Sequence, residues 1–129
     1  MILLTPSIGE QKMTFDVNAR SFKKEIARAR TFGFLKDVEA LRAKGMALGG
    51  SLDNAVVLDE EKVLNESGLR YEDEFIRHKV LDAIGDISTV GKPIKGLLKI
   101  DKAGHDLMNK LVKTLNTKAS SWTEQTLVY

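Results

Sequence analysis

The sequence predicts an α+β fold in which a small mixed β-sheet packs against helices as a two-layer sandwich. The chain has 129 residues, which is the length of one domain, and 43% of them are hydrophobic, which is enough to bury one core. Short runs typical of strands are interleaved with segments whose apolar residues recur at helical spacing. We therefore expect residues 1–129 to form a single domain with the element order β, α, α, β, β, α, β, α.

The first predicted strand covers residues 12–17, because polar and apolar residues alternate there. Helical spacing begins after Ser21, a residue that can cap a helix, and is interrupted at 31–33. It resumes over 35–44. We expect two helical pieces with a bend between them.

Glycines at 45–50 predict a loop, after which two short apolar strands, 55–58 and 62–64, are expected to form a hairpin across an acidic turn. The best-defined helix covers 72–87, with acidic residues in its first turn, where the helix dipole favours them.

A Gly-Lys-Pro sequence ends this segment at 91–93. Residues 94–100 are predicted as a strand and 104–116 as a second amphipathic helix, followed by an extended tail over 122–129. The residues of this last helix that we expect to point inward are Leu107, Leu111, Val112 and Leu115.

Composition excludes several kinds of site. The chain has no cysteine, so disulfides, thiolate zinc clusters and cysteine nucleophiles are excluded, and a metal would need His, Asp or Glu. No stretch has the roughly 18 to 20 apolar residues that span a bilayer, and the first residues do not form a basic leader with an apolar run. Neither a transmembrane segment nor export is expected. Residues 49–51 lack the context of a phosphate-binding loop, and there is no G-x-S-x-G motif.

Charge is segregated along the chain. Residues 20–44 and 92–118 are rich in Lys and Arg, and the intervening 53–74 is rich in Asp and Glu. This pattern fits either solvated faces or a cationic groove for a phosphorylated ligand. Nucleic acid is disfavoured because only 6% of the residues are aromatic and they do not alternate with basic residues.

The helix predicted over 72–87 carries an unusual polar line. His78, Asp82 and Asp86 are spaced i, i+4 and i+8, which places them on one side of a helix. An imidazole and a carboxylate one turn apart can bind one zinc ion at about 2.0–2.2 Å, although a catalytic site needs a third ligand. The same spacing is equally explained by a histidine bonded to its neighbouring carboxylate on a wet face.

The second histidine, His105, follows Gly104 at the predicted start of the last helix. A glycine there lets a ligand approach the backbone, and an imidazole can transfer protons near neutral pH. An exposed residue at a helix start without a chemical role explains it as well.

Several long motifs occur in order along the chain. They are EIARARTFGF at 25–34, GGSLDNA at 49–55, VLN at 63–65 followed by GLR at 68–70, DEF at 73–75, RHKVLDAIGD at 77–86, and Gly104-His105. Together they resemble the UDP-3-O-acyl-N-acetylglucosamine deacetylases, the zinc amidohydrolases of lipid A biosynthesis. The resemblance covers nearly the whole chain and matches the C-terminal one of that family's two similar domains.

The resemblance implies a zinc cofactor held partly by His78 and Asp82. In the family, the third ligand and a glutamate general base come from the N-terminal domain, which we expect this chain to lack. The implied partners are therefore the substrate UDP-3-O-acyl-N-acetylglucosamine and the N-terminal domain or a complementing chain. The isolated chain should bind zinc weakly and have little or no activity.

The resemblance also implies roles for individual residues. His105 would protonate the leaving amine, Asp86 would orient it, and Thr31 would help to hold the developing oxyanion. The basic segment 92–102 would face the diphosphate. The residues implied in substrate binding are Lys79 near the phosphates, Phe32 and Lys102 on the nucleotide side, and Leu35, Val38, Ser51 and Ala55 in the walls of the acyl passage.

Three interpretations stay open at this point. The chain is a domain of a two-domain cytoplasmic deacetylase, a non-catalytic module or regulator that binds the sugar nucleotide or acyl group, or a structural relic. Retention of all six of the residues His78, Lys79, Asp82, Asp86, His105 and Thr31 argues against the relic. Without a partner domain the chain would expose apolar surface, so self-association is also expected.

Overall fold

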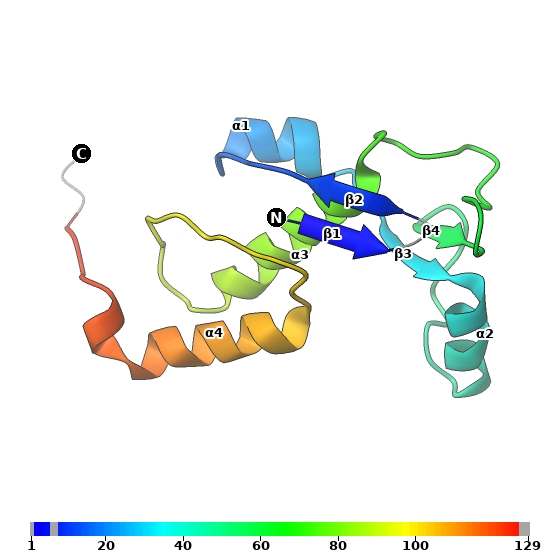
Figure 1. Cartoon of the computed structure of the whole chain (residues 1–129). Helices are drawn as coiled ribbons and strands as arrows, with labels where there is room; N and C mark the ends of the chain where they lie inside the picture. Colours follow the sequence, from blue (N-terminus) through cyan, green and yellow to red (C-terminus); the bar gives the residue numbers. More distant parts are fainter. Residues whose placement is uncertain (1, 6–7, 127–129) are drawn as a thin grey trace.

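The structure is a computed structural model that describes residues 2–5 and 8–126, and helix α3 lies at its centre (Figure 1). Helix α3 (Glu74–Ser88) contacts helix α4 (His105–Thr117), strands β1 (Ile2–Thr5), β2 (Gly9–Lys12) and β3 (Thr31–Phe34), and the π-helical turn η1 (Phe22–Ile26). Helices and strands are thus combined around one central helix, and the predicted α+β class is confirmed.

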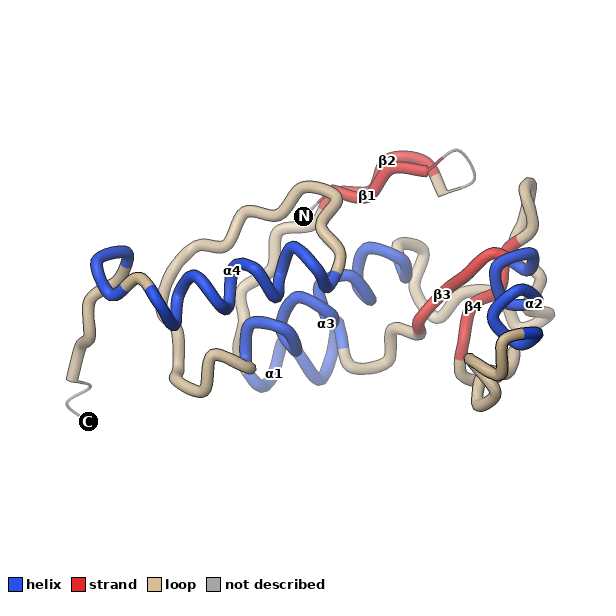
Figure 2. The backbone as a smooth tube through the Cα atoms, turned by 90° about the horizontal axis from the view of Figure 1, so that it is seen from below, coloured by secondary structure: helices blue, strands red, loops and turns tan. Residues whose placement is uncertain are grey.

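Both strand directions occur, in separate sheets. Strands β1 and β2 pair antiparallel, with Ile2 opposite Lys12, whereas β3 and β4 (Ala55–Leu58) pair parallel, with Thr31 opposite Ala55. Within residues 2–5 and 8–126 the strands therefore form two two-stranded sheets rather than one mixed sheet. Helix α2 (Leu35–Ala43) connects β3 to β4, and this β3–α2–β4 unit lies at the end of the molecule opposite the C-terminus (Figure 2).

The bend predicted at residues 31–33 is wrong, because this segment is strand β3. Its partner β4 lies more than twenty residues further along the chain, and parallel strands need such a crossover connection. A short segment flanked by helical spacing gives no local sign of a distant partner. The helix that follows it, α2, agrees with the prediction for 35–44.

The N-terminal elements are shifted from their predicted positions. A strand is predicted over 12–17, but the observed strand β2 lies earlier and ends at Lys12, where its pairing with β1 ends. Residues 13–17 are irregular. The first helix, α1 (Ala19–Ser21), is capped by Asn18, whose Oδ1 accepts a hydrogen bond from the Ser21 N–H at 3.0 Å. Ser21 is therefore inside a capping box rather than the cap itself, and the helix continues as η1.

The predictions for β4, α3 and α4 are confirmed within two residues, and the hairpin predicted across the acidic turn is present in short form. Asp59 Oδ1 accepts hydrogen bonds from the N–H groups of Glu61 and Lys62 and turns the chain back on β4. Residues 62–64 then pair antiparallel with β4 through one bridge, Val63 to Leu58, and the Leu64 N–H donates to the Val57 carbonyl at 2.8 Å. The strand predicted over 94–100 is not formed. Residues 94–100 are irregular. A strand needs a hydrogen-bonded neighbour, which apolar spacing alone does not supply.

The C-terminal tail agrees with its prediction as far as the structure describes it. A short 3₁₀ helix, η2 (Ala119–Ser121), follows α4, and residues 122–126 have no regular structure. The rest of the predicted tail, 127–129, lies outside the described residues.

The core is formed between the β3–β4 sheet and the start of α3. Its buried centre is Val56, Leu58 and Phe75. Partly buried apolar residues surround this centre, namely Ile8, Phe32, Phe34, Val63 and Leu69. The core thus fixes the first turns of α3 against β3, which is where the candidate site begins.

The inward face predicted for α4 is largely confirmed. Val112 is buried and Leu111 and Leu115 are half-buried, whereas Leu107, also predicted to point inward, is 57% exposed. Its neighbour Met108 is buried in its place, and Leu107 lines a surface groove.

The first turn of α3 is held by a side chain that is distant in sequence. Gln11 of β2 accepts a hydrogen bond from the Ile76 N–H through its Oε1, at 3.0 Å. The first N–H groups of a helix have no partner within the helix, so the β1–β2 hairpin satisfies one of them.

Candidate functional site

Helix α3 carries the predicted polar line on the side that its core residues leave free. Phe75, Ile76, Val80 and Ala83 are buried, while His78 and Asp82 lie at the edge of this apolar face with side chains 15% and 19% exposed. The two side chains face each other, with His78 Nε2 3.1 Å from Asp82 Oδ1. This helix therefore positions an imidazole and a carboxylate together in a half-buried setting.

The other ring nitrogen of His78 is also engaged. Nδ1 lies 3.2 Å from the carbonyl oxygen of Ala29, in the segment that leads into β3. A carbonyl oxygen and a carboxylate oxygen both only accept hydrogen bonds. Each ring nitrogen of His78 therefore faces an acceptor, Nδ1 the Ala29 carbonyl and Nε2 the Asp82 carboxylate.

Asp82 has a strongly stabilised carboxylate. Burial raises its pKa, but hydrogen bonds from His78 and Lys79 outweigh burial and lower the pKa to about 2. Lys79 Nζ donates to Oδ2 at 2.9 Å, so the two carboxylate oxygens have different partners. Asp82 is therefore ionised at neutral pH and is held in one orientation.

His105 and Asp86 form a second pair one turn further along α3. Packing of α4 against α3 brings His105 Nδ1 to 2.7 Å from Asp86 Oδ2. The His105 side chain is 62% exposed, whereas that of Asp86 is 18% exposed. Because Nδ1 contacts the carboxylate, Nε2 is the nitrogen left to exchange a proton with a ligand or with solvent.

Strand β3 lies beside the polar line. The ring of Phe32 meets that of Phe75 edge to face, with centroids 5.0 Å apart, and lies 6.2 Å from the His78 ring. Thr31, the preceding residue, is exposed at the start of the strand. The structure thus brings Phe32 to His78 and places Thr31 next to it in the chain.

The other predicted substrate residues lie on two different parts of the fold. Leu35 and Val38 are on α2, Ser51 is in the loop after it, and Ala55 begins β4, so all four belong to the β3–α2–β4 unit. Lys102 is exposed in the segment before α4 and has a positive φ of 49°.

The pair His78 and Asp82 fits a cation. The contact is satisfied by a proton on Nε2 that is donated to the carboxylate, or by a metal ion bound to both atoms in place of that proton. The 3.1 Å separation is close to the ~3.3 Å expected for two ligands of a tetrahedral zinc ion at about 2.0 Å. Among the residues described, no cluster of three or more His, Asp or Glu side chains suited to a metal ion is found.

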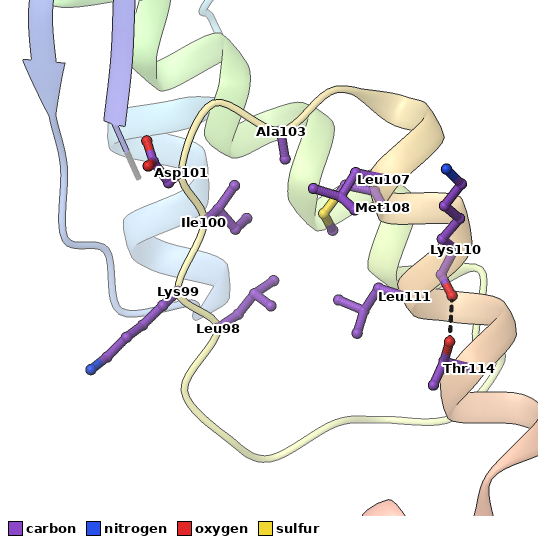
Figure 3. Close-up of a pocket in the computed structure, with 10 residues that line it drawn as sticks. All are labelled: Leu98, Lys99, Ile100, Asp101, Ala103, Leu107, Met108, Lys110, Leu111 and Thr114. Atoms are coloured by element: carbon purple, nitrogen blue, oxygen red, sulfur yellow. Dashed lines mark hydrogen bonds between the residues drawn. The ribbon is translucent and has the colours of Figure 1, made fainter.

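Sequence reasoning missed a groove along α4. It has a volume of about 360 Å³ and is mostly apolar (Figure 3). The residues that line it are Leu98, Lys99, Ile100, Asp101, Ala103, Leu107, Met108, Lys110, Leu111 and Thr114. None of the candidate site residues is among them. The sequence signal for this groove was the run of apolar residues within 94–100, but it was interpreted as a strand of the sheet.

Comparison with known proteins identifies the family. The family model described as UDP-3-O-acyl N-acetylglycosamine deacetylase matches residues 2–117. The chain belongs to this deacetylase family. The resemblance predicted from the motifs is thereby confirmed.

Curated relatives with the name UDP-3-O-acyl-N-acetylglucosamine deacetylase are similar over most of the chain. That of Bdellovibrio bacteriovorus is 54% identical over 117 residues, which are 91% of this chain and 39% of the relative. Those of Campylobacter hominis and Campylobacter fetus are 55% and 53% identical, over 91% and 95% of this chain and 40% and 42% of the relatives. The chain thus spans about two fifths of the length of these deacetylases.

Among the helices in the described part of the chain, none is both long enough and apolar enough to cross a bilayer.

Proposed function

We propose that this chain supplies part of the active site of a zinc-dependent deacetylase that removes the N-acetyl group of UDP-3-O-acyl-N-acetylglucosamine, in lipid A biosynthesis in the cytoplasm. One observation carries the proposal: His78 Nε2 faces Asp82 Oδ1 at 3.1 Å, one helical turn from the His105–Asp86 pair. Family membership supports the same reaction.

His78 and Asp82 would hold zinc as two of its ligands, with the third supplied by the family's N-terminal region. The bound ion would lower the pKa of a water molecule to about 7 and polarise the acetyl carbonyl. Asp82 is suited to this role because Lys79 and His78 keep it ionised and oriented. The Lys79 ammonium donates a hydrogen bond to Asp82. Its positive charge would therefore stabilise this carboxylate in addition to attracting a substrate phosphate.

His105 would donate a proton to the leaving amine through Nε2. Asp86 Oδ2 lies 2.7 Å from Nδ1, accepts its N–H and fixes the ring, so that Nε2 is directed away from the carboxylate. The exposure of the His105 side chain leaves Nε2 open to a substrate.

Thr31 would donate its hydroxyl to the oxyanion formed on attack, a role in which one positioned donor contributes roughly 10²–10³ in rate. Phe32 supports this placement because its ring packs against both Phe75 and His78. The nucleotide would lie along Phe32 and Lys102, and the acyl chain along the β3–α2–β4 unit at Leu35, Val38, Ser51 and Ala55.

The proposal is tested by supplying the region that this chain does not match. The chain is fused to the N-terminal three fifths of the Bdellovibrio bacteriovorus relative, and acetate release from UDP-3-O-acyl-N-acetylglucosamine is measured. We expect activity that a chelator abolishes and zinc restores, whereas the 129-residue chain alone releases little or no acetate.

Two variants of the fusion locate the chemistry in this chain. His78→Ala should abolish zinc-dependent activity, and His105→Gln should lower kcat by about 10²–10⁴. Asn109→Ala, at an exposed position of the same helix as His105, is the matched control and should be neutral. An active His78→Ala fusion would show that the metal assignment is wrong. A fusion that binds the substrate but never hydrolyses it would favour the non-catalytic binding module.

A further inference from the structure

The last third of the chain carries more positive charge than the proposed reaction uses. Residues 92–118 contain seven Lys and only two Asp, with no Arg or Glu. Of these lysines, the proposed function assigns a role to Lys102 alone. The structure shows where the other lysines lie and which apolar side chains accompany them.

The segment that leads into α4 exposes apolar side chains beside its lysines. Residues 91–99 are all exposed. Leu97 is 80% exposed, more than any other large apolar residue that the structure describes, and Ile94 is exposed as well. Lys95 and Lys99 lie within two residues of Leu97 in the sequence. Exposed apolar side chains that gather in one patch mark an interaction site more often than single ones do.

The apolar surface continues across the groove along α4. Leu98 and Leu107 both line this groove and are 43% and 57% exposed. Figure 3 shows the ammonium groups of Lys99 and Lys110 on opposite sides of these apolar side chains. Neither lysine forms an ion pair within the described part of the chain, and Asp101 is the one acidic residue of the lining. An open apolar strip is therefore flanked by cations whose charge is not neutralised.

The surface of an anionic bilayer matches both features of this strip. Anionic headgroups attract lysines, and apolar side chains beside those lysines enter the boundary between headgroups and acyl chains. The long stem of a lysine can lie along apolar surface while its ammonium group stays among the headgroups. A soluble polyanion such as nucleic acid offers the charge but no apolar phase for Leu97 and Leu107, so it fits less well.

We propose that the surface formed by residues 94–99 together with Leu107 and Lys110 binds to bilayers that contain anionic phospholipids. We call it the basic-apolar surface. The inference goes beyond the proposed function and does not depend on it. Binding of this kind would hold the chain on a bilayer surface, where acylated molecules such as the proposed substrate gather.

Co-sedimentation with vesicles tests the proposal. The 129-residue chain is mixed with vesicles of phosphatidylcholine alone, or of phosphatidylcholine with phosphatidylglycerol, at low and at high salt. We expect binding to the vesicles that contain phosphatidylglycerol, and weaker binding as salt rises, because salt screens the attraction between lysines and headgroups. Binding to neither kind of vesicle, or equal binding to both, would overturn the proposal.

Trp122 provides a spectroscopic readout because it is the only tryptophan in the chain. Lys92 Nζ lies 5.7 Å from the centre of its ring, so the ring lies beside the start of the exposed segment. Tryptophan is favoured at the boundary between membrane and water. We expect its emission to shift to shorter wavelength when the chain binds vesicles. An unchanged emission from the bound chain would show that another face meets the bilayer, contrary to the proposal.

Two variants and a matched control locate the binding on this surface. Lys95→Gln/Lys99→Gln should weaken vesicle binding about 25-fold, because each lysine near an anionic surface contributes about fivefold. Leu97→Ser should weaken it by about tenfold, because it removes apolar contact with the bilayer. The control, Lys23→Gln/Lys24→Gln, removes the same charge at exposed positions of η1, which lies on the side of α3 away from α4 (Figure 1), and should bind as the wild type does. Every substituted side chain is exposed, so circular dichroism should show the same fold in all the variants.

Three outcomes of this series would refute the proposal in different ways. Equal losses in the control and in Lys95→Gln/Lys99→Gln would show that only net charge matters. Dependence on the lysines without dependence on Leu97 would assign the surface to soluble polyanions instead. The last arm uses the fusion to the N-terminal three fifths of the Bdellovibrio bacteriovorus relative, which should bind vesicles as the chain alone does. Loss of binding in the fusion would show that the N-terminal region covers the basic-apolar surface.

Discussion

Asn65 lies just after the β3–α2–β4 unit and should be one of the positions on which the stability of that unit depends most. It is 6% exposed, and its side chain makes three hydrogen bonds to backbone groups. Nδ2 donates to the carbonyls of Leu52 and Ala55 at 2.8 Å each, and Oδ1 accepts from the Val57 N–H at 2.9 Å. At about 1 kcal/mol for each bond, Asn65→Ala should lower the free energy of unfolding by about 3 kcal/mol.

For a domain of this size, 3 kcal/mol corresponds to a fall in Tm of about 10 °C, measured by circular dichroism. The matched control is Asn54→Ala. Asn54 also bonds backbone groups, the Ser51 N–H and the Gly49 carbonyl, but it is exposed, so water replaces those bonds and the cost should be below about 1 kcal/mol. Equal losses of stability in the two variants would refute the reasoning, because burial would then not matter.

Three further outcomes are expected. Burial raises the pKa of Glu74, but hydrogen bonds and charge from Arg30, together with the Arg70 N–H, outweigh burial and hold this pKa below its ordinary value. The ionised Glu74 therefore stabilises the fold above the unfolded pKa of about 4.3, and this stabilisation is lost as pH falls through the folded pKa. The free energy of unfolding of Glu74→Gln, measured against pH in acid, should lack this pH-dependent loss. Phe32→Ala should destabilise the chain by about 2–4 kcal/mol in urea unfolding, since it removes the edge contact with Phe75. Asp86→Asn should change stability by less than about 1 kcal/mol, because its partner His105 is exposed, yet lower the fusion's kcat; a large stability loss would contradict this.

Local signals in the sequence sufficed for the elements that depend on local interactions. Helices α2, α3 and α4 and strand β4 follow from apolar spacing and from the residues at their ends. The pairs His78–Asp82 and Asp86–His105 follow in part from helical spacing, since three of these four residues share one face of α3.

Contacts between distant residues could not be predicted in this way. Strand β3 depends on its partner β4, and the Nδ1 contact of His78 is made with the carbonyl of Ala29, which is 49 residues away. On α4, Val112 is buried as predicted, but Leu107 is not, because Leu107 and Met108 are both apolar and only packing in the folded chain decides which one is buried. Pattern gives the elements, whereas their pairing is a property of the folded chain.

The hydrogen bond between Gln11 and the Ile76 amide should control the hydrogen exchange of that amide. The start of α3 lacks a local side-chain cap, and one of its amides is protected by a residue 65 positions earlier. Deuterium should therefore replace the Ile76 amide proton whenever the β1–β2 hairpin separates from α3, even while the helix stays wound. The exchange rate of that one proton would report the docking of the N-terminal hairpin.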